Sequence, residues 1–430
     1  MKELINYPKG KLWPKEFQKL VQQKFAFIYD DPDLGKRLFF DNSGGSLRLI
    51  QGIEVKHDID LLPDCTERSH ERAVLLQNII KKCYEDVLRV MFNAKGGSLM
   101  TTLSASQCMF QMVEPILVNV KGTNAVTTNL EHPSAYDAVR FYCEQTGKEF
   151  RVVEADRETG YIKPEDVAAK VDEGTVLLSV IASSNISGNL IDLKGIIEAA
   201  KKKNPDIYII TDAVQHMPHS TLDVDELGVD GANFAPYKFY ATRGIGFAYV
   251  SDRLSKLPHP KLIAKPDEVW ELGTPAPSIF ASMSAVVDYI CWIGKYFHED
   301  AKTRREEYLC GMHEIEMHER ALLYRLLEGT AEVPGLRHMK NVEVYADNKD
   351  LTKRDLIVAM GINGMHHTDA RKLYAKKGVT VYERINTSLY SKRIVEAIGL
   401  SGVIRVSPMH AYGEDDMDTF LKITKDISMS

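Results

Sequence analysis

The chain has 430 residues, of which 44% are hydrophobic and 27% are charged, as in ordinary soluble globular proteins. Its formal net charge of −6 provides neither the basic surface of a nucleic-acid-binding protein nor a polybasic patch for a membrane. The first residues lack the apolar segment of a signal peptide, and no run reaches the roughly 18 apolar residues that span a bilayer.

The six cysteines lie far apart, and none forms a CxxC pair or a zinc-ligand spacing. Reduced thiols in a cytosol are the expected state, so the predicted location is the cytoplasm. His313 and His318 are five residues apart, whereas a helical zinc site needs a spacing of four. We expect a solvated helix face there and no metal site.

Residues 1–70 are predicted to be helical and rich in loops, and to pack with the C-terminal part of the chain. Residues 71–300 are predicted to form a large α/β domain, because apolar runs alternate with amphipathic helical stretches. This pattern predicts a mostly parallel sheet with helices on both faces. The seven runs are residues 97–104, 124–130, 149–155, 175–183, 206–213, 231–236 and 244–250.

The last of these runs follows its predecessor too closely for a helical crossover, so we expect that strand to be antiparallel. Residues 301–430 are predicted to form a smaller α+β domain. It begins with a long amphipathic helix at 303–330, and helices separate its short strands. Those strands are residues 342–347, 356–361, 379–385 and 403–409.

Polar residues follow several of the predicted strands of the large domain. Asp212 and Gln215 come after one strand, and Asn185, His132 and Lys238 come after three others. In an open α/β sheet, ligands bind beyond the carboxyl ends of the strands. A carboxylate directly after a buried strand, such as that of Asp212, needs a cationic partner.

These residue types match what pyridoxal phosphate requires. A lysine such as Lys238 forms a Schiff base with the aldehyde of the cofactor. Asp212 would keep the pyridine nitrogen protonated, so that the ring accepts electrons. His132 offers a flat ring for stacking, and the small residues around Ser106 open a helix whose free N–H groups would hold the phosphate.

Residues 206–250, which contain "TDAVQH" and "FAPYKFYATRGIG", resemble the core of the class V aminotransferases. This is the cysteine-desulfurase-like branch of the fold-type I pyridoxal-phosphate enzymes. Six further motifs of the family occur on both sides of this segment, in the same order as in the family, and they extend over most of the chain. They are "FFDNSGGS", "LSASQCM", "EHPS", "SNISG", "WELGTPAP" and "IRVSPMHAYG".

The resemblance implies a catalytic role for three residues. Lys238 would carry the cofactor and move the α-proton, Asp212 would bind the pyridine nitrogen, and His132 would stack on the ring. It also implies that Arg405 clamps the substrate carboxylate with its two-pronged guanidinium.

The remaining implied contacts divide between cofactor and substrate. Gly273 and Thr274 would reach the phosphate of a neighbouring subunit, which implies a homodimer with its active site at the subunit interface. The other cofactor contacts would be Ala105, Ser106, Asn185, Gln215 and Tyr237. The other substrate contacts would be Asn185, Ser43, Gly44 and Arg384.

The chain departs from the family beside the lysine and in one loop. Ala235 and Tyr237 replace a frequent serine and histidine, and the Tyr-Lys pair is similar to that of kynureninases. A phenol still donates a hydrogen bond to phosphate. The loop before Arg405, where desulfurases carry a nucleophilic cysteine, contains none, and Cys108 is a poor substitute.

The predicted function is a pyridoxal-phosphate enzyme that acts on a small amino acid through an α-carbanion, with an aminotransferase as the first choice. A β-elimination lyase resembling selenocysteine lyase or kynureninase, an epimerase, and a non-catalytic relative are the alternatives. A transaminase usually needs a second cation for a dicarboxylic substrate, for which Arg243 and Arg384 are candidates. Tyr390, His57 and His70 are further candidates for substrate contacts.

Overall fold

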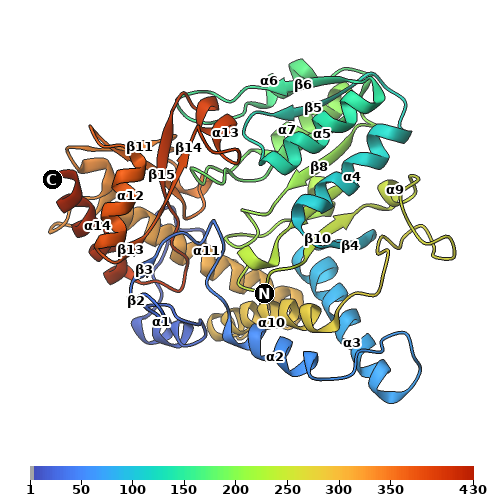
Figure 1. The fold of residues 1–430 in the computed structure, drawn as a ribbon, viewed down its shortest axis with the longest axis horizontal. Helices are drawn as coiled ribbons and strands as arrows, with labels where there is room; N and C mark the ends of the chain where they lie inside the picture. The colour runs from blue at the N-terminus through green and yellow to red at the C-terminus, as the bar shows by residue number, and fades with distance from the viewer. Residues whose placement is uncertain (1–3) are drawn as a thin grey trace.

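The computed structural model describes residues 4–430 and places a seven-stranded sheet between layers of helices, with a smaller sheet to one side (Figure 1). Six strands are parallel, and β10 is antiparallel to both of its neighbours, β4 and β9. All seven predicted strands and the predicted antiparallel strand are thus confirmed. In spatial order they are β4 (Ser98–Thr102), β10 (Gly246–Val250), β9 (Gly231–Phe234), β8 (Tyr208–Asp212), β7 (Thr175–Ile181), β5 (Asn124–Thr128) and β6 (Glu149–Val153).

Both faces of this sheet are buried, which explains why its strands are almost continuously apolar. Leu177 and Ile210 pack into the layer under α4 (Ala105–Asn119) and α5 (Pro133–Thr146). Leu178 and Ile209, the adjacent residues in these strands, belong to the core on the opposite face, as the pleat requires. The helices on that second face include α6 (Pro164–Lys170), α7 (Leu193–Lys203) and α8 (Val224–Leu227).

Two long helices run beneath the sheet and join it to the C-terminal part (Figure 1). They are α10 (Pro277–Phe297) and α11 (Arg304–Glu328), and a capping box on Thr303 begins α11. By length and composition α10 is apolar enough to cross a membrane, but 83% of its most apolar stretch is buried inside the protein. Its hydropathy is therefore that of a core helix.

The C-terminal part contains an antiparallel sheet in the order β11 (Val342–Tyr345), β12 (Val358–Ile362), β15 (Gly402–Val406) and β14 (Tyr382–Ile385). The predicted strand at 379–385 is divided, because Val379–Thr380 leaves this sheet as β13 and pairs with β3 (Leu38–Phe39). The helices of this part are α12 (His367–Lys376), α13 (Lys392–Ala397) and α14 (Glu414–Ser428).

The N-terminal segment contacts both parts of the molecule. Gln18 of α1 (Lys15–Gln22) donates to the carbonyl of Ala411, and β3 pairs with β13. By contrast, α2 (Ile50–Asp60) and α3 (Glu71–Glu85) lie against α10 (Figure 1). The domain boundaries given above stay a prediction.

Candidate active site

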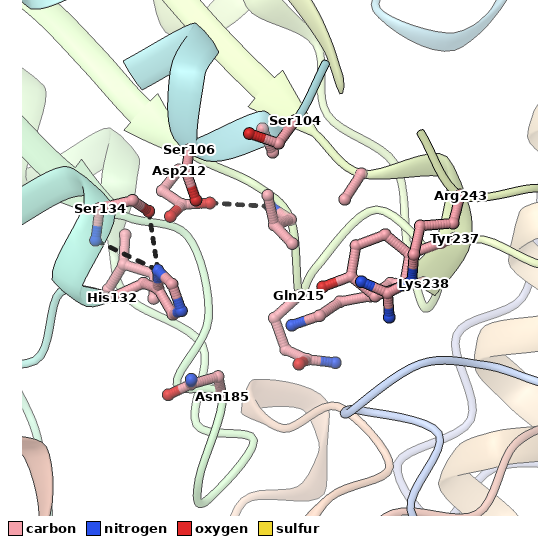
Figure 2. A pocket seen from close by; sticks show the side chains of 14 residues that line it. Ser104, Ser106, His132, Ser134, Asn185, Asp212, Gln215, Tyr237, Lys238 and Arg243 are labelled. Carbon is pink, nitrogen blue, oxygen red and sulfur yellow. Dashed lines mark hydrogen bonds between the residues drawn. The ribbon is translucent and has the colours of Figure 1, made fainter. Parts of the chain in front are cut away.

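The candidate site is a cavity at the carboxyl edge of the large sheet, where open α/β sheets form ligand-binding crevices between strand ends. Asp212 is the last residue of β8, and His132 and Asn185 lie in the turns after β5 and β7. Lys238 ends the short 3₁₀ turn η2 (Pro236–Lys238) after β9. Figure 2 shows these side chains around one cavity, with Lys238 and Gln215 between His132 and Tyr237.

The pKa of the Lys238 amine is lowered by its surroundings. Burial lowers its pKa to about 7, and the positive charge of Arg405 acts in the same direction, while Asp212 partly opposes the shift. An amine must be uncharged to attack a carbonyl, and a buried lysine reaches that state near neutral pH. A lysine with such a pKa is suited to Schiff-base formation.

Asp212 is a buried carboxylate with little compensation from the protein. Its side chain is 3% exposed and accepts one backbone hydrogen bond, from Val214 at 3.1 Å. Burial therefore raises its pKa, although the charge of Lys238 opposes the shift. A cation in the cavity would relieve this cost, and a protonated pyridine nitrogen is such a cation.

His132 is held as a neutral ring. Its Nδ1 accepts the backbone N–H of Ser134 at 3.3 Å and lies 2.7 Å from the Ser134 hydroxyl, which places the ring proton on Nε2. Burial, with Lys238 as the second cause, lowers the pKa of His132 to about 3. A flat uncharged ring beside the lysine suits stacking on an aromatic cofactor. Sequence reasoning did not name Ser134, which fixes this ring.

The start of α4 opens onto the same cavity. Ser104, Ala105 and Ser106 line it, and the Ser104 hydroxyl accepts the N–H of Gln107 as an N-cap. Asn233 donates to the carbonyl of Ala105 at 3.0 Å and ties this turn to β9. Free N–H groups at the start of a 15-residue helix attract an anion such as a phosphate.

Tyr237 and Arg243 form the wall opposite His132 (Figure 2). The guanidinium of Arg243 lies 3.8 Å from the centre of the Tyr237 ring, which is a cation–π contact. The Tyr237 carbonyl accepts hydrogen bonds from Ser46 and Arg48. These contacts fix the turn that carries Lys238.

Several buried polar atoms of the site have no protein partner. Within residues 4–430, nothing bonds to Gln215 Oε1 or Asn185 Oδ1 in the cavity, or to the Ser43 hydroxyl in the segment that follows Asp41. Such atoms are rare in native proteins, and each calls for an explanation such as a ligand. A pyridoxal phosphate molecule fits this set, because it offers a ring, a phosphate and polar substituents to partners of these kinds. The residues present therefore fit the cofactor.

The C-terminal part supplies two arginines to the site. Arg405 of β15 is 2% exposed and donates to Asp41 Oδ1 at 2.7 Å and to the Asn185 carbonyl at 3.1 Å. Arg384 of β14 donates to the Tyr390 carbonyl, and the Tyr390 ring is stacked 6.4 Å from His132. Asp41 was missed from the sequence, although it lies within the quoted "FFDNSGGS".

Several of the predicted residues do not line this cavity, Ser43 and Gly44 among them. Gly273 and Thr274 line a separate hollow beside α4, and Thr274 donates to Glu67 at 2.7 Å. His70 caps α3, and His57 lies within α2, so neither lines the cavity.

Cys108 is unsuited to nucleophilic chemistry. It is buried in α4 with its sulfur 3.1 Å from the Thr102 hydroxyl, and burial raises its pKa to about 12. The thiol therefore stays protonated near neutral pH.

A family model described as Aminotransferase class-V matches residues 64–420 of the chain. The cysteine desulfurase IscS of Dictyoglomus turgidum is 33% identical over 173 residues, which cover 40% of this chain and 43% of that protein. The chain thus matches less than half the length of that curated relative.

Among solved structures, the apo cysteine desulfurase from Thermococcus onnurineus NA1 matches with a TM-score of 0.80 at 19% identity, over 96% of this chain and 98% of that chain. The cysteine desulfurase CsdA from Escherichia coli matches with a TM-score of 0.78 at 17% identity, over 97% and 99% of the two chains. At these identities the likeness shows a shared fold alone, and that fold is the fold-type I architecture expected from the sequence.

Proposed function

The chain belongs to the aminotransferase class-V family, whose enzymes depend on pyridoxal phosphate, and from this premise we propose that it is a β-elimination lyase for a small amino acid. The observation that carries the proposal is the half-buried Lys238, whose pKa is lowered to about 7, among unpaired polar groups that fit the cofactor. When bound, pyridoxal phosphate supplies an electron sink next to the α-carbon of the substrate.

Each residue of the site then has its own role in the proposed elimination. Lys238 takes the proton from the α-carbon, and Asp212 keeps a positive charge on the ring nitrogen. His132 covers one face of the ring, and Arg405 with Asn185 orients the substrate carboxylate. The electron pair of the C–H bond forms a new bond between the α- and β-carbons, while the β-substituent departs with its own bonding pair and gains a proton.

Two lines of reasoning favour elimination over the aminotransferase predicted first. The relatives described above are named cysteine desulfurases, and the removal of sulfur from cysteine breaks a bond at the β-carbon. The stretch 386–404 before Arg405 contains no cysteine that would accept the sulfur, so we propose its release into solution. For L-cysteine and water, the products would be pyruvate, ammonia and sulfide.

Transamination is the second candidate, because it shares the step in which Lys238 takes the α-proton and differs only in where the proton returns. The family itself takes its name from this reaction. An amino group that stays on the protein until a keto acid is added would identify a transaminase.

The test is a product assay with L-cysteine and the pyridoxal-phosphate-loaded protein. Pyruvate, ammonia and sulfide in equal amounts would support elimination. Alanine with a protein-bound persulfide would contradict it in favour of a desulfurase, and turnover that requires an added keto acid would contradict it in favour of transamination. Lys238→Ala should lose at least about a hundredfold in rate, whereas the exposed Lys256→Ala should retain it.

We also propose a homodimer in which Gly273 and Thr274 contact the cofactor phosphate of the neighbouring subunit. Both residues line a hollow outside the cavity, and the nearby Leu103 and Leu272 are 78% and 53% exposed. Exposed apolar side chains beside a hollow favour an intersubunit contact. Light scattering that gives the mass of a monomer would overturn this part of the proposal.

A further inference from the structure

Two arginines approach the substrate side of the cavity from adjacent strands. In the pairing of β14 with β15, Tyr382 lies opposite Arg405 and Arg384 lies opposite Val403. Side chains two residues apart along a strand share a face, and directly opposed residues share it too. Arg384 and Arg405 therefore lie on the same face of the sheet, as diagonal neighbours.

The two guanidinium groups differ in how far they are already paired. Arg405 holds Asp41 Oδ1 at 2.7 Å, and the pair is buried, with the two side chains 2% and 19% exposed. Arg384 donates to one backbone carbonyl, that of Tyr390. In the described part of the chain, the Nε atoms of both arginines are buried without a partner. One arginine is thus neutralised by a carboxylate, and the other is not.

Asp41 is held in this position by its surroundings. Its backbone forms a bridge with Ser407, and the neighbouring Asn42 donates to the Ser407 carbonyl. A Cβ atom at Gly44 would lie 2.8 Å from Asp41 Oδ2, so the glycine leaves room for the carboxylate. The aspartate is therefore a fixed part of the site.

Three other arginines near the cavity are occupied elsewhere. Arg48 donates to the carbonyls of Ser46 and Tyr237. Arg243 lies over the Tyr237 ring on the opposite wall. Arg393 donates to the carbonyls of Asn129 and Glu131. Burial and the charge of Arg405 lower the pKa of Arg384 to about 10, so it stays charged near neutral pH.

The substrate side thus contains two positive groups and one negative group, which leave one net positive charge. One substrate carboxylate neutralises that charge. A second carboxylate would be left as a partly buried anion without a partner, which is unfavourable.

We propose that Asp41 is a specificity-determining residue that restricts the site to substrates with a single carboxylate. This inference rests on the proposed function and names its substrate class: amino acids whose side chains carry no acid group. It replaces the expectation that Arg384 or Arg243 receives the second carboxylate of a dicarboxylic substrate, because Asp41 already takes that charge.

L-Alanine and L-aspartate provide the test, since they differ only by a carboxyl group on the β-carbon. Each is titrated into the pyridoxal-phosphate-loaded protein, and its dissociation constant is read from the visible absorbance of the bound cofactor. The wild type should bind alanine at least about tenfold more tightly than aspartate, because like charges a few ångströms apart in a partly buried site repel by more than that difference.

Asp41→Asn keeps a hydrogen-bonding group beside Arg405 but removes the negative charge. It should shift the aspartate-to-alanine ratio by about tenfold or more in favour of aspartate. The matched control, Asp33→Asn, removes an exposed carboxylate of the same segment and should leave the ratio unchanged. Arg384→Gln should weaken alanine binding without improving aspartate binding, which keeps the inference testable if Asp41→Asn does not fold.

Three results would overturn the inference: equal effects of Asp41→Asn on both amino acids, a wild-type preference for aspartate, or no effect of Arg384→Gln on alanine. Each of them would leave the proposed elimination chemistry intact, since the cofactor would still respond to amino acids. A loaded protein that responds to no amino acid would instead overturn the proposed function and this inference together.

Discussion

Lys238 owes its reactivity to its position, since an exposed lysine has a pKa near 10.4. Burial disfavours its charged form, Arg405 does the same, and Asp212 only partly compensates. The result is an amine whose pKa of about 7 matches the pH at which most enzymes work. Arg405 thus influences the lysine in addition to any contact with a substrate.

This lowered pKa predicts how the cofactor-free protein takes up pyridoxal phosphate. Only the neutral amine attacks the aldehyde, so the rate of uptake should rise with pH and level off above about pH 7 to 8. Stopped-flow absorbance between pH 5.5 and 10 measures this profile. A midpoint above pH 9 would show that the lysine has an ordinary pKa and would contradict the argument.

The sequence predicted the residues at strand ends well and the pairing of distant residues poorly. Lys238, Asp212 and His132 were found because each follows an apolar run that was recognisable as a strand. The Asp41–Arg405 pair joins residues 364 positions apart, and no local pattern encodes such a contact. A motif shows that a residue is near the site, but only the fold shows which charge it meets.

At the scale of elements, the close crossing of α10 and α11 depends on two glycines. A Cβ atom at Gly311 would lie 2.0 Å from the carbonyl oxygen of Ile290, and one at Gly294 would lie 1.9 Å from that of Glu307. The two helix backbones therefore touch. Both helices were visible in the sequence as apolar or amphipathic stretches, but neither periodicity revealed where they cross.

Gly311→Ala should therefore destabilise the protein, although alanine favours helix formation. The new methyl group must push the two helices apart, which should cost at least about 2 kcal/mol. Chemical denaturation followed by circular dichroism measures the loss. Gly413→Ala is the matched control, because its Cβ atom would make only ordinary contacts, with Gln18 at 3.7 Å and Asp416 at 4.0 Å. Equal midpoints for the two variants would contradict the tight crossing.

At the scale of the whole molecule, a buried polar cluster joins the large sheet to the C-terminal part. His219, in the loop after β8, lies 2.6 Å from Glu319 of α11, whose other oxygen accepts the backbone N–H of His410 at 3.0 Å. The His410 ring contacts the hydroxyls of Tyr240 and Tyr289. All five residues are buried. The cluster therefore links the part of the chain that contains Lys238 to the part that contains Arg384 and Arg405.

This cluster predicts a pH-dependent contribution to stability. Although burial opposes it, Glu319 raises the pKa of His219 to about 9, so the stabilisation is full below about pH 6.5 and is lost as the pH rises through 9. His219 in turn lowers the pKa of Glu319 to about 2, so its contribution is full above about pH 4.5 and is lost only as the pH falls through 2.

Glu319→Gln should accordingly cost about 3 kcal/mol near pH 6, because it leaves a buried histidine without its partner. Denaturation midpoints at pH 6 and pH 9 should show the deficit shrinking at the higher pH. The exposed Glu332→Gln serves as the control at both pH values. A deficit that stays constant or grows toward pH 9 would contradict this assignment.

The fold as a whole was more predictable than the arrangement of its parts. The alternation of apolar runs and helices predicted the seven-stranded sheet and its antiparallel member. It did not predict that α2 lies against α10 or that β13 leaves the smaller sheet to pair with β3. Those contacts depend on packing between distant segments, which hydrophobic periodicity does not encode.

We propose above all that Lys238 carries pyridoxal phosphate at the edge of this sheet. The most direct measurement is borohydride reduction of the protein purified with the cofactor, followed by peptide mapping with mass spectrometry. The phosphopyridoxyl group should be fixed on the peptide containing Lys238, and Lys238→Ala should carry no label at that peptide. Label on another lysine, or none on a protein saturated with the cofactor, would contradict it.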